Sequence, residues 1–176
     1  LANGLTTGDE VVTITGATTA AQADAIADLT TGAVTATITA DVASALNAAL
    51  VDANAGANAY KLTVNGATAE ATDLNALVAK TSEAIKVDAK EITGLQAALA
   101  DIFVNNKDEF TGEEKVAVKI TDTTVAAAAA DAIADKTSGV VTANIAAGTA
   151  AALNLALVDA GKQVNAYALT VTGGPG

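Results

Sequence analysis

Oxygen-bearing side chains are the groups in this sequence that could do chemistry, and one acidic stretch concentrates them. Carboxylates are hard ligands of the kind that Ca²⁺ binds, so this stretch is a candidate calcium site. Its spacing does not match an EF-hand loop, and the competing interpretation is a solvated acidic loop. The carboxylates concerned are Asp101, Asp108, Glu109, Glu113 and Glu114.

A second oxygen-rich stretch runs from Asp52 to Asn58, with potential ligand oxygens at alternate positions. Its Gly56 stands one position too early for a calcium loop. The related stretch from Asp159 to Asn165 carries its glycine elsewhere, at Gly161. A turn at a helix C-terminus explains both stretches better than a metal site does.

Two pairs of carboxylates have the spacing of one helical turn, Asp24 with Asp28 and Asp131 with Asp135. Carboxylates placed in this way could act as acid and base or share a metal ion. Nothing in the sequence indicates a pocket around them. We therefore expect both pairs to lie on solvated helix faces.

Threonines alternate with apolar residues in several segments and would line one face of a sheet. Such a face could contact carbohydrate, a partner protein or ice, although threonine is also an ordinary exposed strand residue. Lys61, Lys86 and Lys119 interrupt the rows, and a twisted sheet is a poor template for ice. The candidate binding-face residues are Thr13, Thr15, Thr35, Thr37, Thr39, Thr63, Thr170 and Thr172.

Composition narrows the classes of function. The 176 residues include no Cys, His, Met or Trp, and the net charge is −11. Missing histidine removes the usual general base and the commonest zinc ligand, so we expect no enzyme and assign no catalytic or cofactor-binding residue. The negative charge disfavours nucleic acid, and no apolar run approaches the ~20 residues of a membrane span.

A repeated framework must position these side chains. The segment from Ala23 to Gly32 returns 107 residues later, from Ala130 to Gly139. The same shift places Asn58–Tyr60 on Asn165–Tyr167 without a gap. Residues Leu62–Thr68 also resemble Val12–Thr18, at a shift of 50 residues. The chain is therefore read as a tandem repeat.

Strand and helix patterns alternate along the repeat. Gly16 is expected to end the first strand, Thr19 and Gln22 to form a capping box, and Asp41 to cap the second helix. The predicted strands cover residues 11–15, 33–39, 116–120, 140–145 and 167–172, with one further strand around Tyr60, Leu62 and Val64 and another around Ile85 and Val87. The first predicted helix begins at the capping box and stops at Thr31-Gly32, and the second follows Asp41 and ends at the turn of residues 54–56. The other predicted helices cover about 68–80, 91–103, 123–136 and 147–160. The residues expected to face inward from the first four helices are Ala21, Ala25, Ile26, Leu29, Val42, Leu46, Ala49, Leu50, Leu74, Leu77, Val78, Leu95, Leu99 and Ile102.

Strict alternation of strands and helices predicts an α/β fold with parallel strands and right-handed crossovers. The strands are apolar on one face only, so the helices should cover one face of the sheet and leave the other open. The predicted architecture is a one-sided, solenoid-like array of βα units. The alternative is a two-layer α/β fold with a mixed or antiparallel sheet.

The pattern divides the chain into repeat units. A lead-in at 1–10 precedes a first unit at 11–61. A second unit at 62–115 contains an inserted acidic loop at 104–114. A third unit at 116–172 precedes a tail at 173–176. The chain begins at Leu1 without a signal-peptide pattern, so we expect any targeting segment to lie outside it.

The residues from Thr18 to Asp28, from Thr31 to Thr35 and from Ile38 to Ala53 resemble a known kind of repeat. They are similar to the Ala/Thr/Asp-rich tandem repeats of large secreted cyanobacterial and proteobacterial surface proteins, both adhesins and S-layer-like proteins. The resemblance implies an extracellular location and a structural or adhesive role. The Gly-Gly-x-Gly-x-Asp nonapeptide of neighbouring RTX segments is absent, so their calcium binding is not carried over.

Two functions from different classes follow. The first is a structural repeat segment of a bacterial surface protein that acts in extension, adhesion or self-assembly as a stalk, filament or lattice, with neighbouring repeats or further copies as its partners. The second is a binding module that uses the exposed threonine and lysine face for carbohydrate, a partner protein or ice.

Overall fold

The structure, a computed structural model, describes residues 8–51, 57–158 and 164–173. Most of the predicted lead-in and tail lie outside these residues. So do residues 52–56 and 159–163, which hold most of the two loops weighed above as calcium loops.

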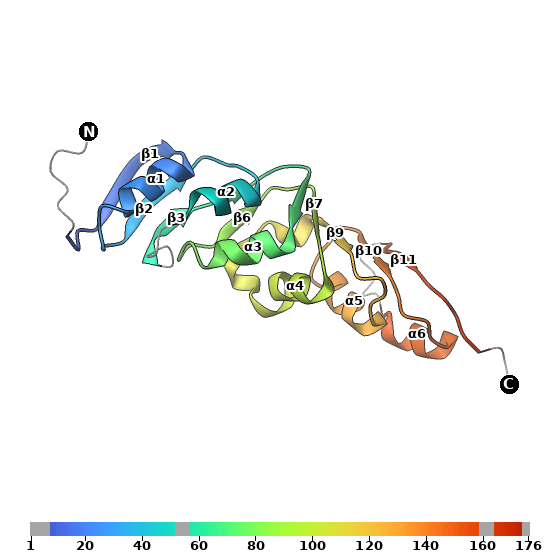
Figure 1. Cartoon of the computed structure of the whole chain (residues 1–176). Helices are drawn as coiled ribbons and strands as arrows, with labels where there is room; N and C mark the ends of the chain where they lie inside the picture. Colours follow the sequence, from blue (N-terminus) through green and yellow to red (C-terminus); the bar gives the residue numbers. More distant parts are fainter. Residues whose placement is uncertain (1–7, 52–56, 159–163, 174–176) are drawn as a thin grey trace.

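The described residues form short strands and helices in succession (Figure 1). In the N-terminal half these are β1 (Val12–Thr18), α1 (Ala20–Ala27), β2 (Val34–Ile38), α2 (Ala43–Ala49), β3 (Ala59–Lys61), β4 (Thr63–Val64), β5 (Thr68–Glu70), α3 (Ala71–Val78), β6 (Ile85–Val87) and β7 (Glu91–Gly94). The C-terminal half contains α4 (Gln96–Ala100), a π-helix (Asp101–Asn105), a 3₁₀ helix (Lys107–Glu109), β8 (Phe110–Thr111), a second 3₁₀ helix (Glu113–Lys115), β9 (Ala117–Ile120), α5 (Ala127–Ala134), β10 (Val141–Asn144), α6 (Ala150–Ala156) and β11 (Ala166–Ala168).

The fold is α/β, with parallel sheets flanked by helices. In the described residues the strands form sheets in the orders β1-β2-β3, β4-β6-β8 and β11-β10-β9-β7-β5. All strand pairs in these three sheets are parallel, so the alternative of a mixed or antiparallel sheet is wrong for this part of the chain.

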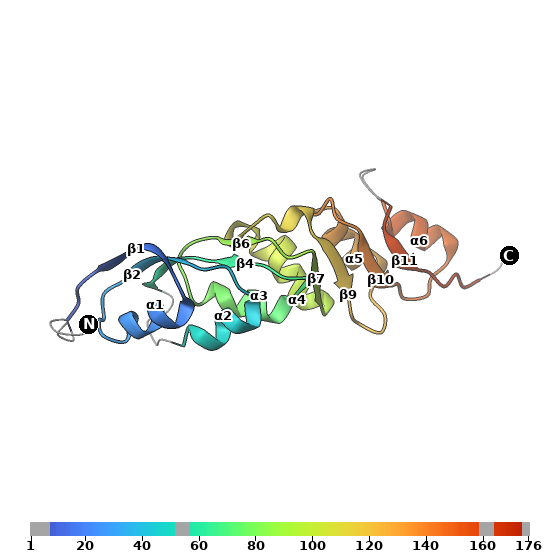
Figure 2. The same cartoon turned by 90° about the horizontal axis from the view of Figure 1, so that it is seen from above.

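Successive elements follow one another along a long axis, with β1 near one end and α6 and β11 near the other (Figures 1 and 2). In Figure 2 helices α1 to α4 lie on one side, and strands β1, β2, β4 and β6 lie on the other. Each helix packs against the next, from α1 to α6. Buried aliphatic side chains join these layers in one core that extends from Ala20 to Leu153.

The backbone repeats with the same shift of 107 residues as the sequence. Residues 18–66 are called the first copy here, and residues 125–173 the second copy. The pairing of Ala36 with Tyr60 between β2 and β3 returns as the pairing of Ala143 with Tyr167 between β10 and β11. The isolated bridge between Asp41 and Val64 returns as the bridge between Gly148 and Val171.

Polar side chains that are buried or half-buried connect successive strand–helix steps, where a step is one strand with the helix that follows it. The Asn58 Oδ1 accepts a hydrogen bond from the Val34 N–H at 2.8 Å, and the equivalent Asn165 Oδ1 accepts one from the Val141 N–H at 3.0 Å. The Thr137 hydroxyl donates to the Val116 carbonyl at 2.9 Å. These contacts satisfy main-chain groups that apolar side chains would leave unpaired.

The expected capping box is confirmed, because the Thr19 hydroxyl accepts from the Gln22 N–H and the Gln22 side chain accepts from the Thr19 N–H. Two neighbouring expectations are wrong. β1 continues through Gly16, whose φ of 86° accommodates an irregular register with β2. The N-cap of α2 is Val42, since Asp41 forms the bridge with Val64 and its carboxylate accepts from the Val42 N–H.

The middle of the chain contains more strand than the pattern predicts. Residues 68–70 and 91–94 were expected to begin helices, but they form β5 and β7. Both strands pair with neighbours in the five-stranded sheet, and these hydrogen bonds outweigh the helical spacing of nearby leucines. The second helix of this region begins later, at Gln96, and continues as a π-helix.

The inward faces of three helices also differ from expectation. In α1 the buried residues are Ala20, Ala23, Asp24 and Ala27, whereas Ala21 and Ala25 are exposed. Val42 and Leu95 are exposed because each occupies the N-cap position before its helix. Leu46, Leu50, Leu74, Leu77, Leu99 and Ile102 are buried as expected.

Candidate functional site

The five acidic candidates lie on the connection from α4 to β9, which contains a π-helix, two short 3₁₀ helices and strand β8. The expectation of an inserted loop at 104–114 is therefore wrong for Phe110–Thr111, because β8 pairs with β6 in the second sheet. Asp101 accepts a hydrogen bond from the Asn105 amide at 2.8 Å, and Asp108 forms an ion pair with Lys107. Glu114 lies 3.5 Å from the Lys115 ammonium, while Glu109 is exposed. Within the described ranges, no three acidic side chains converge in a way that could hold a metal ion.

Glu113 differs from the other acidic candidates because it is buried. Among the described residues no group donates a hydrogen bond to its Oε2 atom. Loss of water around the carboxylate raises the pKa of Glu113 above its ordinary value. Hydrogen bonding to the backbone is the main reason that the pKa of the exposed neighbour Glu114 is lowered.

The helix carboxylates separate into structural and exposed positions. The prediction of a solvated face is wrong for Asp24, which is buried and accepts a hydrogen bond from the Val51 N–H at 2.8 Å. Asp131 is half-buried, and Asp28 and Asp135 are exposed as expected. Asp24 therefore links α1 to the residue that follows the end of α2.

The threonine and lysine rows are distributed over all three sheets. Thr13 pairs with Thr35 and Thr37 pairs with Lys61 in the first sheet, while Lys86 lies between Thr63 and Thr111 in the second. Lys119 pairs with Thr93 and Thr142 in the third. Thr13, Thr15, Thr37 and Thr39 are exposed, and Thr35 and Thr63 are half-buried. Thr170 and Thr172 are exposed but follow β11 rather than lying in it.

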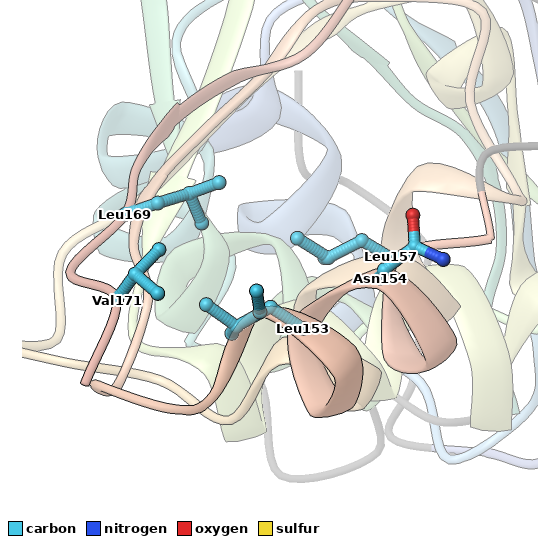
Figure 3. Close-up of a pocket in the computed structure, with 6 residues that line it drawn as sticks. Leu153, Asn154, Leu157, Leu169 and Val171 are labelled. Carbon is cyan, nitrogen blue, oxygen red and sulfur yellow. The ribbon is translucent and has the colours of Figure 1, made fainter. Parts of the chain in front are cut away.

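An apolar hollow lies at the C-terminal end, between α6 and the residues after β11 (Figure 3). It has a volume of about 290 Å³. Figure 3 shows Leu169 and Val171 on one wall, facing Leu153 and Leu157 of the helical segment, with the Asn154 amide beside them. The lining residues are Ala150, Leu153, Asn154, Leu157, Leu169 and Val171.

The sequence analysis missed this hollow, although the repeat contained a signal for it. Leu153 and Asn154 are the second-copy counterparts of Leu46 and Asn47. Leu169 and Val171 are likewise the counterparts of Leu62 and Val64, both of which are buried. Apolar residues that repeat a buried pattern at the end of an array indicate a surface that lacks its cover.

Comparison of the chain with protein-family models, with curated proteins and with solved structures finds no match. Within the described part of the chain, every helix is too short or too polar to cross a membrane.

Proposed function

We propose that this chain is a structural segment of an extracellular bacterial surface protein and that it acts by stacking strand–helix steps along one axis. The single observation that carries the proposal is the connection between neighbouring steps. Parallel strand pairs and helix contacts join neighbouring steps along the described residues, and the side chains of Asn58 and Asn165 add hydrogen bonds between strands at two places.

Such an arrangement suits extension because the number of steps sets the length. Each step buries its apolar side against its neighbours, so steps can be added without enlarging a central core. The first strand, β1, and the last helix, α6, lie at opposite ends, which is the geometry that a stalk or filament requires (Figure 1). The bacterial surface location and the adhesive or lattice-forming variants of this role derive from the resemblance stated above.

The ends of the sheets support association in line. Among the described residues, β1 is the terminal strand of the first sheet and β11 is the terminal strand of the five-stranded sheet. A terminal strand presents main-chain donors and acceptors that another strand can pair with. The net charge of −11 opposes non-specific clustering of chains.

Labelling of intact cells and electron microscopy test this proposal together. Antibodies raised against the chain should bind unpermeabilised cells of the organism that makes it, and native material should form rods, stalks or a lattice. Small-angle scattering of the isolated chain should give an elongated particle. A chain found only inside cells, or a compact particle in solution, would contradict the proposal.

The exposed threonine and lysine rows support a second candidate function, a binding module for carbohydrate, a partner protein or ice. The row of Thr63, Lys86 and Thr111 crosses three neighbouring strands. Lys86→Glu should then abolish binding on a glycan array, whereas Lys80→Glu, at a residue that lies after α3 and outside the strands, should leave it unchanged. Absence of glycan binding together with unaltered ice-crystal shape would remove this candidate.

A further inference from the structure

The two copies differ at residues that the repeat makes equivalent. Leu62 and Val64 of the first copy are 1% and 0% exposed, whereas Leu169 and Val171 of the second copy are 49% and 58% exposed. The residue types are identical, and the pairing with the preceding step is the same. The difference therefore arises on the other side, from the step that follows.

The first copy shows what covers these residues. The Lys86 N–H donates to the Leu62 carbonyl at 3.0 Å, and the Asp88 N–H donates to the Val64 carbonyl at 2.7 Å. Helix α3, whose Leu74 is fully buried, packs against α2. The cover is thus one helix and one parallel strand from the next step.

A polar contact sets the position of that cover. The Asn47 amide on α2 donates to the Asp73 carbonyl in the first turn of α3, at 2.8 Å. Asn154 is its counterpart in the second copy, and it lies exposed at the rim of the apolar hollow. The second copy therefore keeps both the apolar residues and the amide that receive a following helix in the first copy.

We infer that the C-terminal face of this chain is a docking surface for a further βα unit of the kind formed by residues 67–103. The helix of that unit lies on α6 and fills the hollow beside Leu169 and Val171. The Asn154 amide donates to a carbonyl in the first turn of this helix. A strand of the same unit pairs with the main chain at Leu169 and Val171, as β6 pairs with β4.

The N-terminal end of another molecule of this chain fits this surface less well. Its terminal helix, α1, exposes small residues such as Ala21 and Ala25, and β1 exposes Thr13 and Thr15. A unit like residues 67–103 instead brings large apolar residues at the positions of Leu74 and Leu77. This docking rests on the proposed stacking function, because a further βα unit would be the partner on which the chain stacks.

A single cysteine reports whether the surface is covered, because the chain has no cysteine of its own. Val171→Cys is placed in the chain and in an extended chain that carries residues 67–103 directly after Gly173, the residue equivalent to Gly66. Docking should slow alkylation of the cysteine at 171 by about tenfold or more, because the reagent would then reach the thiol only when the added unit opens locally. Asn154→Ala in the extended chain should restore part of the faster rate.

Two matched controls separate docking from general effects. Leu74→Asp with Leu77→Asp in the added unit alone should return the labelling rate to that of the original chain. Val11→Cys, at the far end of the molecule, should label at one rate in both chains.

Three outcomes would overturn the inference. The added unit could fold, as judged by circular dichroism, while the cysteine at 171 labels as fast as before. The added unit could fail to fold on this surface. In the original chain, labelling of the cysteine could slow as the protein concentration rises, and the chain could sediment as a dimer. Another molecule of this chain would then be the occupant. The proposed function is tested separately, because none of these outcomes depends on whether the chain lies at the cell surface or is an elongated particle.

Discussion

Leu62 and Leu169 are the same residue in two copies of one pattern, and their environments are opposite. Both follow a strand that pairs in the same register with the step before it. Leu62 is buried because β6 and α3 follow, whereas Leu169 lines an open hollow. The comparison teaches that in a stacked array the neighbouring step, and not the local sequence, decides how much a residue contributes to stability.

The largest expected effect is on the free energy of unfolding when either leucine is shortened. Leu62→Ala should lower the free energy of unfolding by about 2–5 kcal/mol, because it leaves a cavity between two steps. Leu169→Ala should lower it by less than about 1 kcal/mol, because the side chain is already half in water. Urea unfolding followed by circular dichroism measures both. Equal losses for the two variants would break the comparison.

A second pair concerns the carboxylates of α1 and α5. Asp24→Ala should cost about 1.5–3 kcal/mol, because the Val51 N–H then loses the charged oxygen that the buried Asp24 side chain provides. Asp131→Ala should cost less, since Asp131 is only half-buried. Asp24→Asn retains an acceptor oxygen and should recover most of the loss. The same unfolding measurement applies, and a loss for Asp24→Asn as large as that for Asp24→Ala would refute the role given to this oxygen.

The asparagines before β3 and β11 give a further comparison between the first and the second copy. Asn58→Ala should cost about 1–3 kcal/mol, because the buried Val34 N–H would be left without a partner. Asn165→Ala removes the same contact at a half-buried site and should cost less. Hydrogen exchange at the Val34 and Val141 amides gives a local measure. Faster exchange at Val141 alone would contradict the expected order.

The smallest expected effect depends on pH and concerns Glu113, a buried carboxylate that lies outside both copies. Because burial raises the pKa of Glu113, the native chain binds this proton more tightly than the unfolded chain does. Stability should therefore fall as pH rises from the ordinary value of 4.5 through the raised pKa.

Glu113→Gln should remove this part of the pH dependence and raise the melting temperature by a few degrees near neutral pH. Thermal melts from about pH 4 to pH 8 measure the change. Glu114→Gln is the matched control, because its carboxylate is exposed. A pH profile that is identical for the original chain and Glu113→Gln would show that burial of this carboxylate has no effect on stability.

Much of the fold could be predicted because some signals are local. Alternating threonines around Val34 and Ile38 predict β2, and the Thr19–Gln22 pair predicts the start of α1. Both depend on hydrogen bonds and side-chain directions within a few residues. The candidate metal ligands illustrate the opposite case, since the spacing of Asp101, Asp108 and Glu113 says nothing about whether they meet in space.

The sequence by itself determined the α/β class, the alternation of strands and helices and the self-similarity at a shift of 107 residues, because these follow from local periodicity and from comparison of the chain with itself. It left a mixed or antiparallel sheet open, and the pairing in the structure showed that the described strands are parallel. Only the tertiary structure decided that residues 91–94 pair as a strand, that Asp24 faces inward and that Leu169 lies open while Leu62 is buried. The physical reason is that strand pairing and burial are properties of two surfaces in contact, and one segment of sequence describes only one of the two.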